Sequence, residues 1–339
     1  MDVKIDFVVT WLDSNDPEWK KEYIKYKYAG VKGDDSEVRF RDWDLFRYWF
    51  RAVECYAPWV NKVFLVTNGT FPDWINNKCE KLVLVKHSDY IPQEFLPTFN
   101  SCTIELHMNK IPGLSEHFVY FNDDVFLTAP VKQEDYFREG LPCDDNRETV
   151  FNVPVYSPKD KFGIYMSMLA NIGLINKHFN RWLTVRQSIR RWFGPHLGIK
   201  GILLSFNLKR QHKFIGFSWR HYEQPYLKSI FDEAWEKEPE MLNKSCTRFR
   251  EEVILNPYFF RYWQFASNNF YPIKNGPNRY LTINEHNLDA LNNILQNKKM
   301  KSLCINDTPY CSHDEFCRIK DKVGSIFENV FSQKSSFEK

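Results

Sequence analysis

The stretch FVYFNDDVFL, residues 118–127, decides the fold of this chain. An apolar run ends there in Asn122-Asp123-Asp124, and a second apolar run follows directly. The pattern predicts a buried strand ending in two carboxylates, at the edge where an α/β sheet opens its ligand crevice. Paired carboxylates at such an edge commonly hold Mg²⁺ or Mn²⁺ against a nucleotide diphosphate. A strand followed by a turn rich in Asn and Asp fits the same letters, so the pair alone leaves both interpretations open.

Strand-like and helix-like segments alternate around this stretch. Asn15-Asp16-Pro17 is typical of a helix start, with Asp16 as N-cap and Pro17 as the first helical residue. The predicted strands are 5–12, 60–67, 82–87 and 118–121, and the predicted helices are 17–29 and 42–56. This alternation predicts an α/β fold with a mostly parallel sheet.

Length and composition allow a large folded core. The chain has 339 residues, of which 43% are hydrophobic and 17% aromatic. No apolar run approaches the roughly 18 residues that cross a bilayer. The N-terminus, MDVKIDFVVTWLD, is strand-like and lacks the features of a secretory signal. We therefore expect a cytoplasmic protein.

Positive charge is concentrated in the middle of the chain. The formal net charge is only +3, but residues 161–222 contain 11 Lys and Arg and no Asp or Glu. Such asymmetry indicates an anionic partner: a lipid surface, a diphosphate-linked acceptor, an anionic glycan or nucleic acid. Residues 177–220 mix arginines with bulky apolar groups, which on a helix is typical of membrane-associating surfaces. The favoured interpretation of the apolar side is a helix packed on the core, with an arginine-rich outer side.

Several motifs precede the acidic pair in a fixed order. They are IDFVVTWLDSNDP at 5–17, RFRD at 39–42, LFRY at 45–48, VFLVTNG at 63–69, LPTFNS at 96–101 and IPGLS at 111–115. Two later blocks are RHYEQPYLK at 220–228 and CIND at 304–307. Together they resemble the Stealth family of sugar-1-phosphate transferases. That family includes bacterial capsular and exopolysaccharide phosphotransferases, and the animal N-acetylglucosamine-1-phosphotransferase that starts the lysosomal mannose-6-phosphate tag.

The resemblance implies an architecture and a reaction. The expected core is Rossmann-like and similar to the GT-A fold, with a basic helical insertion. The expected parts are a nucleotide-sugar-binding core at 1–155, a basic, largely helical insertion at 156–222 on the acceptor or membrane side, a segment at 223–331 that completes the core, and a frayed tail at 332–339. The expected reaction moves a hexose-1-phosphate, such as N-acetylhexosamine-1-phosphate, from a UDP-sugar to a glycan hydroxyl and releases UMP.

The resemblance also assigns residues to the phosphate end. Asp123 and Asp124 are expected beside the diphosphate, with Asp124, Asn306 and Asp307 holding Mg²⁺ or Mn²⁺. His221 is the candidate general base because imidazole titrates near neutral pH; it alternatively only hydrogen-bonds donor or backbone. Arg248 and Arg250 alternate, so on a strand both face one side, where guanidinium groups suit phosphate oxygens. One of these arginines alternatively forms a structural ion pair.

Other residues are assigned to the nucleotide and the donor sugar. Thr10, Trp11 and Asp13 end the first strand, where base and ribose are expected, although Trp11 also fits the core. Arg39 and Asp42 complete the nucleotide end or form a surface ion-pair network. The donor-sugar candidates are Asn100, Ser101 and Glu105.

Three classes of function remain open from the sequence. The first is sugar-1-phosphate transfer to a lipid-linked glycan acceptor, with peripheral association at the inner face of the membrane. The second is a metal-dependent GT-A glycosyltransferase that releases UDP. The third is a non-enzymatic protein that binds anionic glycan or nucleic acid; no nucleic-acid-binding module is recognised, which favours an enzyme without nucleic acid as partner.

Overall fold

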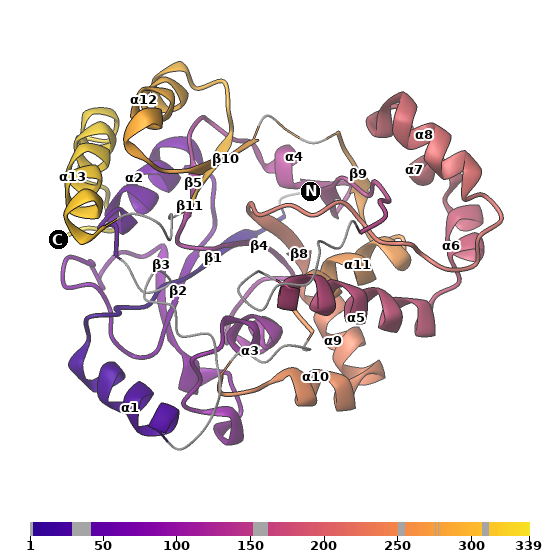
Figure 1. Ribbon diagram of the computed structural model, residues 1–339, viewed down its shortest axis with the longest axis horizontal. Coiled ribbons are helices and arrows are strands. Elements are labelled where there is room, and N and C mark those ends of the chain that lie inside the picture. Colours follow the sequence, from indigo (N-terminus) through magenta and orange to yellow (C-terminus); the bar gives the residue numbers. More distant parts are fainter. Residues whose placement is uncertain are drawn as a thin grey trace.

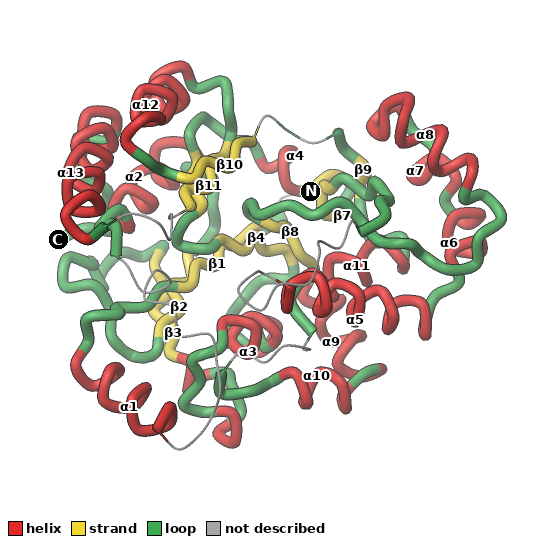
Figure 2. Tube along the Cα trace, in the orientation of Figure 1, coloured by secondary structure: helices red, strands yellow, loops and turns green. Residues whose placement is uncertain are grey.

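A five-stranded sheet forms the centre of the molecule (Figures 1 and 2). The computed structural model describes residues 3–28, 42–151, 162–249, 255–274, 276, 278–306 and 312–339. The strand order is β3-β2-β1-β4-β8. The strands are β1 (Ile5–Thr10), β2 (Val63–Thr67), β3 (Leu82–Lys86), β4 (His117–Phe121) and β8 (Gln224–Leu227). The first four run parallel and β8 runs antiparallel to β4, which confirms the prediction of a mostly parallel α/β sheet.

The helices that connect the parallel strands begin and end as their sequences dictate. The Asp16 carboxylate accepts a hydrogen bond from the backbone N–H of Glu18 at 2.9 Å, so it caps α1 (Pro17–Tyr28) as predicted. In α2 (Phe46–Tyr56), Trp49 and Phe50 are fully buried in the core that also contains β1. The short α3 (Ser101–Leu106) follows further along the chain.

The order of the sheet reverses at β1. The chain runs from β1 through β2 to β3 and then crosses back, so that β4 lies on the other side of β1. Ligands of open α/β sheets bind where the carboxyl ends of such strands diverge. The residues after Thr10 in β1 and after Phe121 in β4 lie at this point.

Two three-stranded sheets adjoin the main sheet. One has the order β10-β11-β5, with β11 antiparallel to β5 and Cys304 opposite Val125. Its strands are β5 (Val125–Leu127), β10 (Asn278–Thr282) and β11 (Ser302–Asn306), and α12 (Leu288–Asn297) and α13 (His313–Val330) follow these strands in the chain. The other has the order β6-β7-β9. It contains β6 (Phe137–Arg138), β7 (Leu141–Asp144) and β9 (Tyr271–Pro272), with α4 (Gln133–Tyr136) before β6.

Four α-helices lie within residues 162–207 of the basic segment, and residues 208–222 form turns and loop. The helices are α5 (Phe162–His178), α6 (Arg181–Gln187), α7 (Ile189–Trp192) and α8 (Gly198–Asn207). Arg181 is fully buried and its guanidinium donates to the Glu148 carboxylate at 2.7 to 3.0 Å, which fixes the start of α6. Figure 1 places α6, α7 and α8 at one end of the molecule. The remaining helices are α9 (Lys228–Lys237), α10 (Pro239–Ser245) and α11 (Tyr258–Ala266).

The C-terminal tail is packed, so the expectation of a frayed tail at 332–339 is wrong. Phe337 is buried in the core, and the Glu338 carboxylate accepts two hydrogen bonds from the Arg51 guanidinium, at 2.8 and 2.9 Å. Glu338 also forms a β-bridge with Ile75. Buried Phe337 and the Arg51–Glu338 ion pair therefore hold the C-terminal tail, although its polar sequence suggested a frayed segment.

Candidate functional site

The two acidic residues lie in the turn between β4 and β5. The backbone N–H of Val125 donates to the carbonyl of Asn122 at 3.2 Å, which closes the turn. The backbone N–H of Ile305 donates to the carbonyl of Asp124 at 2.8 Å, so β11 continues alongside the turn. Asp123 is exposed and Asp124 is half-buried. The pair therefore lies at the carboxyl end of β4, next to the point where the strand order reverses.

Asp124 joins residues from three distant parts of the chain. Its Oδ2 lies 3.3 Å from His221 Nε2 and 3.5 Å from Cys304 Sγ. Its Oδ1 is buried and has no hydrogen-bond partner among the described residues. One ligand atom each from Asp124, His221 and Cys304 falls within 4.8 Å of the others. The structure therefore brings together two residues that the sequence singled out, Asp124 and His221.

Cys304 is the member of this cluster that sequence reasoning did not assign to the site. Burial raises the pKa of its thiol far above the usual range, and the nearby Asp124 carboxylate raises it further. The thiol therefore stays protonated and donates its S–H to Asp124 Oδ2. Its position just before Ile305-Asn306, in a block matching the family, was the available signal.

Asp123 has a perturbed carboxyl group. Surrounding protein atoms raise its pKa to about 7, and the carboxylates of Asp124 and Asp42 add to the effect. The side chain is nonetheless exposed, so water screens part of this repulsion. Three carboxylates close to one another disfavour ionisation in the absence of a counter-cation. Asp42, expected at the nucleotide end, thus lies near the acidic pair.

The donor set fits a hard divalent cation. Mg²⁺ and Mn²⁺ prefer carboxylate oxygens, and Asp124 Oδ1 is a buried oxygen that lacks a partner among the residues described. Asn306 ends β11, next to Ile305, whose N–H bonds the Asp124 backbone. Sulfur is a soft ligand that suits Mg²⁺ and Mn²⁺ less well than oxygen does, so the oxygen donors are the ones that fit a hard cation. Asp307, Arg39 and Arg250 lie outside the described residues.

A buried ionic network holds the segment that carries His221. Burial alone would raise the pKa of Asp144, but Arg261 and Arg220 hold it below its usual value. Asp144 pairs with Arg261 at 2.7 Å and with Arg220 at 3.3 Å, and it accepts from Gln224 Nε2 at 2.8 Å. Arg220 and Gln224 flank His221, so β7 and α11 position the base candidate. The sequence signal was that Asp144 begins an Asp-Asp pair, like the pair at 123–124.

The residues expected at the nucleotide end occupy three different environments. The Thr10 hydroxyl lies 3.1 Å from Tyr120 Oη, and Tyr120 donates to Asn122 Oδ1 at 2.7 Å, so Thr10 connects to the acidic turn. Trp11 stacks on Phe46, with 5.6 Å between ring centroids and 6° between planes, as the core alternative expects. Asp13 accepts from the backbone N–H of Asn15 at 2.8 Å and so orders the turn after β1.

The donor-sugar candidates lie on α3. Asn100 is buried and caps α3, with its Oδ1 accepting from Cys102 N–H and its Nδ2 donating to Thr247 Oγ1. Ser101 is exposed at the first position of α3. Glu105 is buried. The pKa of Tyr120 is raised mainly because Tyr120 itself is buried, and the charge of Glu105 raises it further. Both ends of the Asn100 amide are engaged, while a sugar contact by Ser101 or Glu105 stays a prediction.

Arg248 is engaged away from the acidic turn. Its Nε donates to the carbonyl of Pro97 at 2.9 Å and its Nη2 to that of Leu96 at 3.1 Å. The guanidinium also lies 4.2 Å from the ring centroid of Tyr26. Arg248 therefore holds the Leu96-Pro97 segment in place. A contact between Arg248 and the diphosphate stays a prediction.

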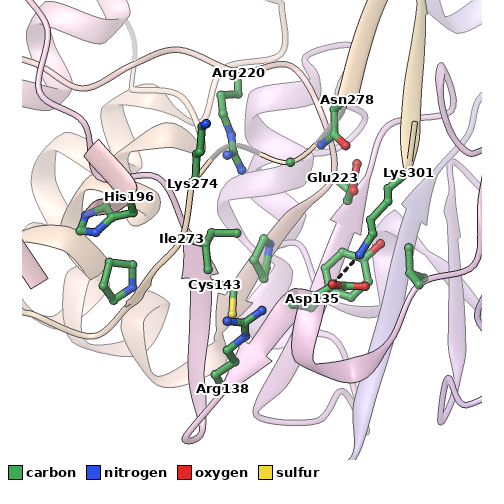
Figure 3. A pocket seen from close by; sticks show the side chains of 15 residues that line it. Asp135, Arg138, Cys143, His196, Arg220, Glu223, Ile273, Lys274, Asn278 and Lys301 are labelled. Atoms are coloured by element: carbon green, nitrogen blue, oxygen red, sulfur yellow. Dashed lines mark ion pairs between the residues drawn. The ribbon is translucent and has the colours of Figure 1, made fainter. Parts of the chain in front are cut away.

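A cavity of about 370 Å³ lies next to the chain segment that carries His221, and Figure 3 shows the side chains that line it. Arg220 and Glu223, on either side of His221 in the sequence, line it together with His196 from the segment before α8. Its other charged side chains are Asp135, Arg138, Lys274 and Lys301, and Lys301 pairs with Asp135 at 2.6 Å. The cavity therefore has a mixed lining, in which apolar residues such as Val131 and Ile273 lie beside charged side chains that are mainly basic.

Comparison with known proteins identifies the family. Residues 39–143 match Stealth protein CR2, conserved region 2. The chain is 39% identical to the capsular polysaccharide phosphotransferase WcwK of Streptococcus pneumoniae, over 99% of this chain and 98% of that protein. It is 38% identical to the receptor polysaccharide phosphotransferase WefC of Streptococcus oralis, over 99% of each chain. It is 36% identical to the exopolysaccharide phosphotransferase cps2G of Lactiplantibacillus plantarum, over 99% and 96%.

Solved structures offer more distant similarity. The galactosyltransferase LgtC, in complex with donor and acceptor sugar analogs, is 8% identical with a TM-score of 0.36, over 94% of this chain and 95% of that one. The bifunctional glycosyltransferase WbbM is 9% identical with a TM-score of 0.38, over 97% and 52%. The fold assignment rests on the sheet order itself, and the family on the full-length relatives. The chain is an enzyme and belongs to the Stealth family of polysaccharide phosphotransferases.

Proposed function

We propose that this enzyme transfers a hexose-1-phosphate from a UDP-sugar to a glycan hydroxyl, forming a phosphodiester and releasing UMP. The main support for this proposal is the pairing of Asp124 with His221 at the carboxyl end of β4. This pairing supports a site in which a carboxylate serves the diphosphate side and a histidine serves as base, at the strand ends where nucleotides bind in open α/β sheets. The full-length relatives named as polysaccharide phosphotransferases support the same reaction class.

The bond changes define what the residues must do. The acceptor oxygen attacks the β-phosphorus of the UDP-sugar, and the bond from that phosphorus to the oxygen bridging the two phosphates breaks. UMP leaves with the bridging oxygen, while the sugar stays attached to the transferred phosphorus. The acceptor hydroxyl loses a proton, and negative charge gathers around phosphorus in the transition state. The site therefore needs a proton acceptor and groups that stabilise anionic oxygens.

His221 is our candidate for the proton acceptor. When its Nε2–H donates to Asp124 Oδ2, the lone pair that accepts a proton lies on Nδ1. Asp124 then fixes the tautomer and stabilises the imidazolium that forms, as carboxylates do for catalytic histidines generally. The ion pairs of Arg220 and Arg261 with Asp144 hold this segment in place during the reaction.

Asp124 and Asp123 are our candidates to hold Mg²⁺ or Mn²⁺. Asp124 Oδ1 is buried and aimed away from His221's hydrogen bond, which uses Oδ2. Asn306, at the end of β11, would add an amide oxygen. The bound cation would neutralise the donor diphosphate and the charge that develops on the leaving UMP. Thr10 and Asp13, at the end of β1, would lie on the nucleotide side.

The proposed acceptor is a lipid-linked glycan presented at the cytoplasmic face of a membrane. The cavity next to the segment that carries His221 supports this assignment, because the glycan must bring a hydroxyl to the base from outside the nucleotide site. Across the described ranges, no helix is both long and apolar enough to cross a bilayer. Access to a lipid-linked acceptor would then come from the surface of the membrane.

The product distinguishes this reaction from glycosyl transfer. The enzyme is incubated with a UDP-hexose or UDP-N-acetylhexosamine, Mg²⁺ or Mn²⁺ and a synthetic glycan acceptor, and the product is analysed by mass spectrometry and ³¹P NMR. We expect an acceptor that has gained a sugar phosphate and shows a phosphodiester resonance. An acceptor that has gained the sugar without phosphorus would refute the proposal and make the protein a glycosyltransferase.

A further inference from the structure

Helix α8 turns its apolar side to solvent. Ile199, Leu203 and Phe206 are 80%, 59% and 55% exposed, and Ile202 beside them is also exposed. These four residues, the α8 face, follow the helical spacing of a single stripe. The buried residues of α8 are instead Gly201 and Ser205. A Cβ at Gly201 would lie only 2.9 Å from Leu197 Cβ, so the inner side of the helix accepts only small residues.

This arrangement is the reverse of an ordinary surface helix. A helix that packs on a protein core buries its large apolar side chains and exposes its polar ones. Four adjoining exposed apolar residues instead mark an interaction surface. Leu183 of α6 and Ile189 of α7 are likewise exposed, so apolar exposure continues through the same end of the molecule. The α8 face is therefore built to contact something outside this chain.

The charge around the α8 face restricts what that partner is. Lys200, Lys209 and Arg210 are exposed on or just after the helix, and Lys209 Nζ lies 3.8 Å from the ring centroid of Phe206. The whole segment 161–222 has no acidic residue. A second copy of this chain docking through the same face would place like charges against one another. A surface that is apolar inside and anionic outside complements the α8 face instead.

We infer that α8 is an in-plane anchor that docks the enzyme on an anionic lipid bilayer. Its apolar face enters the headgroup–acyl boundary while the flanking Lys and Arg side chains bind lipid phosphates. His196, immediately before α8, lines the cavity together with Arg220 and Glu223. The anchor is thus joined by a short connection to the cavity next to the segment that carries His221. Docking agrees with the proposed lipid-linked acceptor but stands on the geometry of α8 alone.

Vesicle sedimentation tests the inference directly. The full chain is mixed with vesicles of phosphatidylglycerol and phosphatidylcholine in equal parts, and with vesicles of phosphatidylcholine alone. We expect binding to the anionic vesicles and little to the neutral ones. Leu203→Glu/Phe206→Glu is expected to weaken binding about ten-fold or more, because it removes two apolar anchors and adds repulsion. Lys200→Gln/Lys209→Gln is expected to weaken it about five-fold for each lysine removed.

The matched control is Ile24→Glu, which changes an exposed isoleucine on α1 at the other end of the molecule. It is expected to bind vesicles like the wild type. Equal binding by all variants, or no binding by the wild type, would overturn the inference. A wild-type dimer that becomes monomeric in Leu203→Glu/Phe206→Glu, seen by light scattering, would assign the α8 face to self-association and overturn it too.

Transfer assays separate this inference from the proposed function. Leu203→Glu/Phe206→Glu is expected to act normally on a short acceptor without lipid and poorly on the same acceptor embedded in vesicles. If no enzyme form transfers sugar phosphate but wild-type vesicle binding persists, the proposed function fails and the anchor stands. If the wild-type enzyme transfers sugar phosphate but does not bind vesicles, the membrane anchor is refuted and the proposed function stands.

Discussion

At the residue scale, Asp124 has two oxygens with separate roles. Oδ2 is shared by His221 Nε2 and the Cys304 thiol, while Oδ1 is buried and lacks a partner among the described residues. An oxygen left in this state costs free energy unless a ligand satisfies it. The residue therefore links a candidate metal position with the candidate base.

Asp124→Asn is expected to abolish transfer while the protein stays folded. An amide removes the negative charge that the cation and the His221 imidazolium require, so we expect kcat to fall on the order of 10²- to 10³-fold or more. Initial rates and a thermal melt measure both properties. Asp321→Asn, on the exposed side of α13, is the control and is expected to act normally. A fully active Asp124→Asn enzyme would contradict the assigned site.

Cys304 is expected to orient Asp124 rather than react. Cys304→Ala removes the S–H donor to Asp124 Oδ2 and is expected to lower kcat about three- to ten-fold, in line with one weak hydrogen bond. Cys304→Ser restores a donor at the same place and is expected to recover most of the rate. Steady-state kinetics with both variants measures the effect, and equal rates for Ala and Ser would contradict the orienting role.

Sequence reasoning found the residues with distinctive chemistry and missed those defined by partners. Asp123, Asp124 and His221 stand in recognisable blocks. Cys304 and Asp144 stand in blocks that offered a signal, but their partners Asp124 and Arg261 lie 180 and 117 positions away, and a single sequence does not identify such partners. Arg248, predicted beside phosphate, is engaged by the carbonyls of Leu96 and Pro97. The alternation of Arg248 with Arg250 in the sequence could not show that Arg248 donates to these carbonyls.

At the element scale, the site exists because strands from different sheets end together. β1 and β4 are neighbours in the parallel sheet, and β11 pairs with β5 directly after the acidic turn. The long buried strands were predictable because their apolar runs are continuous. The strands β6, β7 and β9 are only two to four residues long, too short for a periodic signal, so their sheet was not predicted.

The Asp144 network is expected to stabilise the His221 segment in a pH-dependent way. Asp144→Asn leaves Arg261 buried without its counter-charge and is expected to cost about 3–5 kcal/mol of unfolding free energy at pH 7. The folded-state pKa of Asp144 is lowered, so its contribution is present above the unfolded value of about 4 and is lost as the pH falls below it. The difference between wild type and variant should therefore shrink toward pH 3.

Urea unfolding at pH 7 and at low pH measures this difference. The control is Glu233→Gln, which breaks an exposed pair with Lys237 on α9 and is expected to cost under about 0.5 kcal/mol. We also expect Asp144→Asn to lower kcat, because Arg220 and Gln224 on either side of His221 lose a shared partner. A pH-independent loss of stability would argue against the ionic origin.

At the scale of the whole molecule, the C-terminal segment packs against α2 in the first part of the chain. Arg51 of α2 is buried and binds the Glu338 carboxylate with Nε and Nη2, while its Nη1 contacts the half-exposed Glu328 of α13. α2 packs against β5, the strand that follows the acidic turn, so the tail supports the element next to the site. The polar sequence of the tail did not predict this packing, because Arg51, the partner of Glu338, lies 287 residues earlier in the chain.

The two carboxylates that contact Arg51 provide a matched pair of variants. Glu338→Ala is expected to cost about 2–4 kcal/mol, because it removes two hydrogen bonds from a buried guanidinium and leaves it only the half-exposed Glu328 as counter-charge. Glu328→Ala removes a partner that is half-exposed and is expected to cost under about 1 kcal/mol. Chemical denaturation of both variants gives the comparison. Equal, small losses would mean that the tail does not hold the core.

The nucleotide released from the donor tests the central claim most directly. The enzyme, a UDP-sugar, Mg²⁺ or Mn²⁺ and a glycan acceptor are mixed, and UMP and UDP are separated by chromatography over time. The account predicts UMP in amounts equal to product, formed only when acceptor is present, because the acceptor oxygen attacks the β-phosphorus. Release of UDP would place the attack at the anomeric carbon and would contradict sugar-1-phosphate transfer.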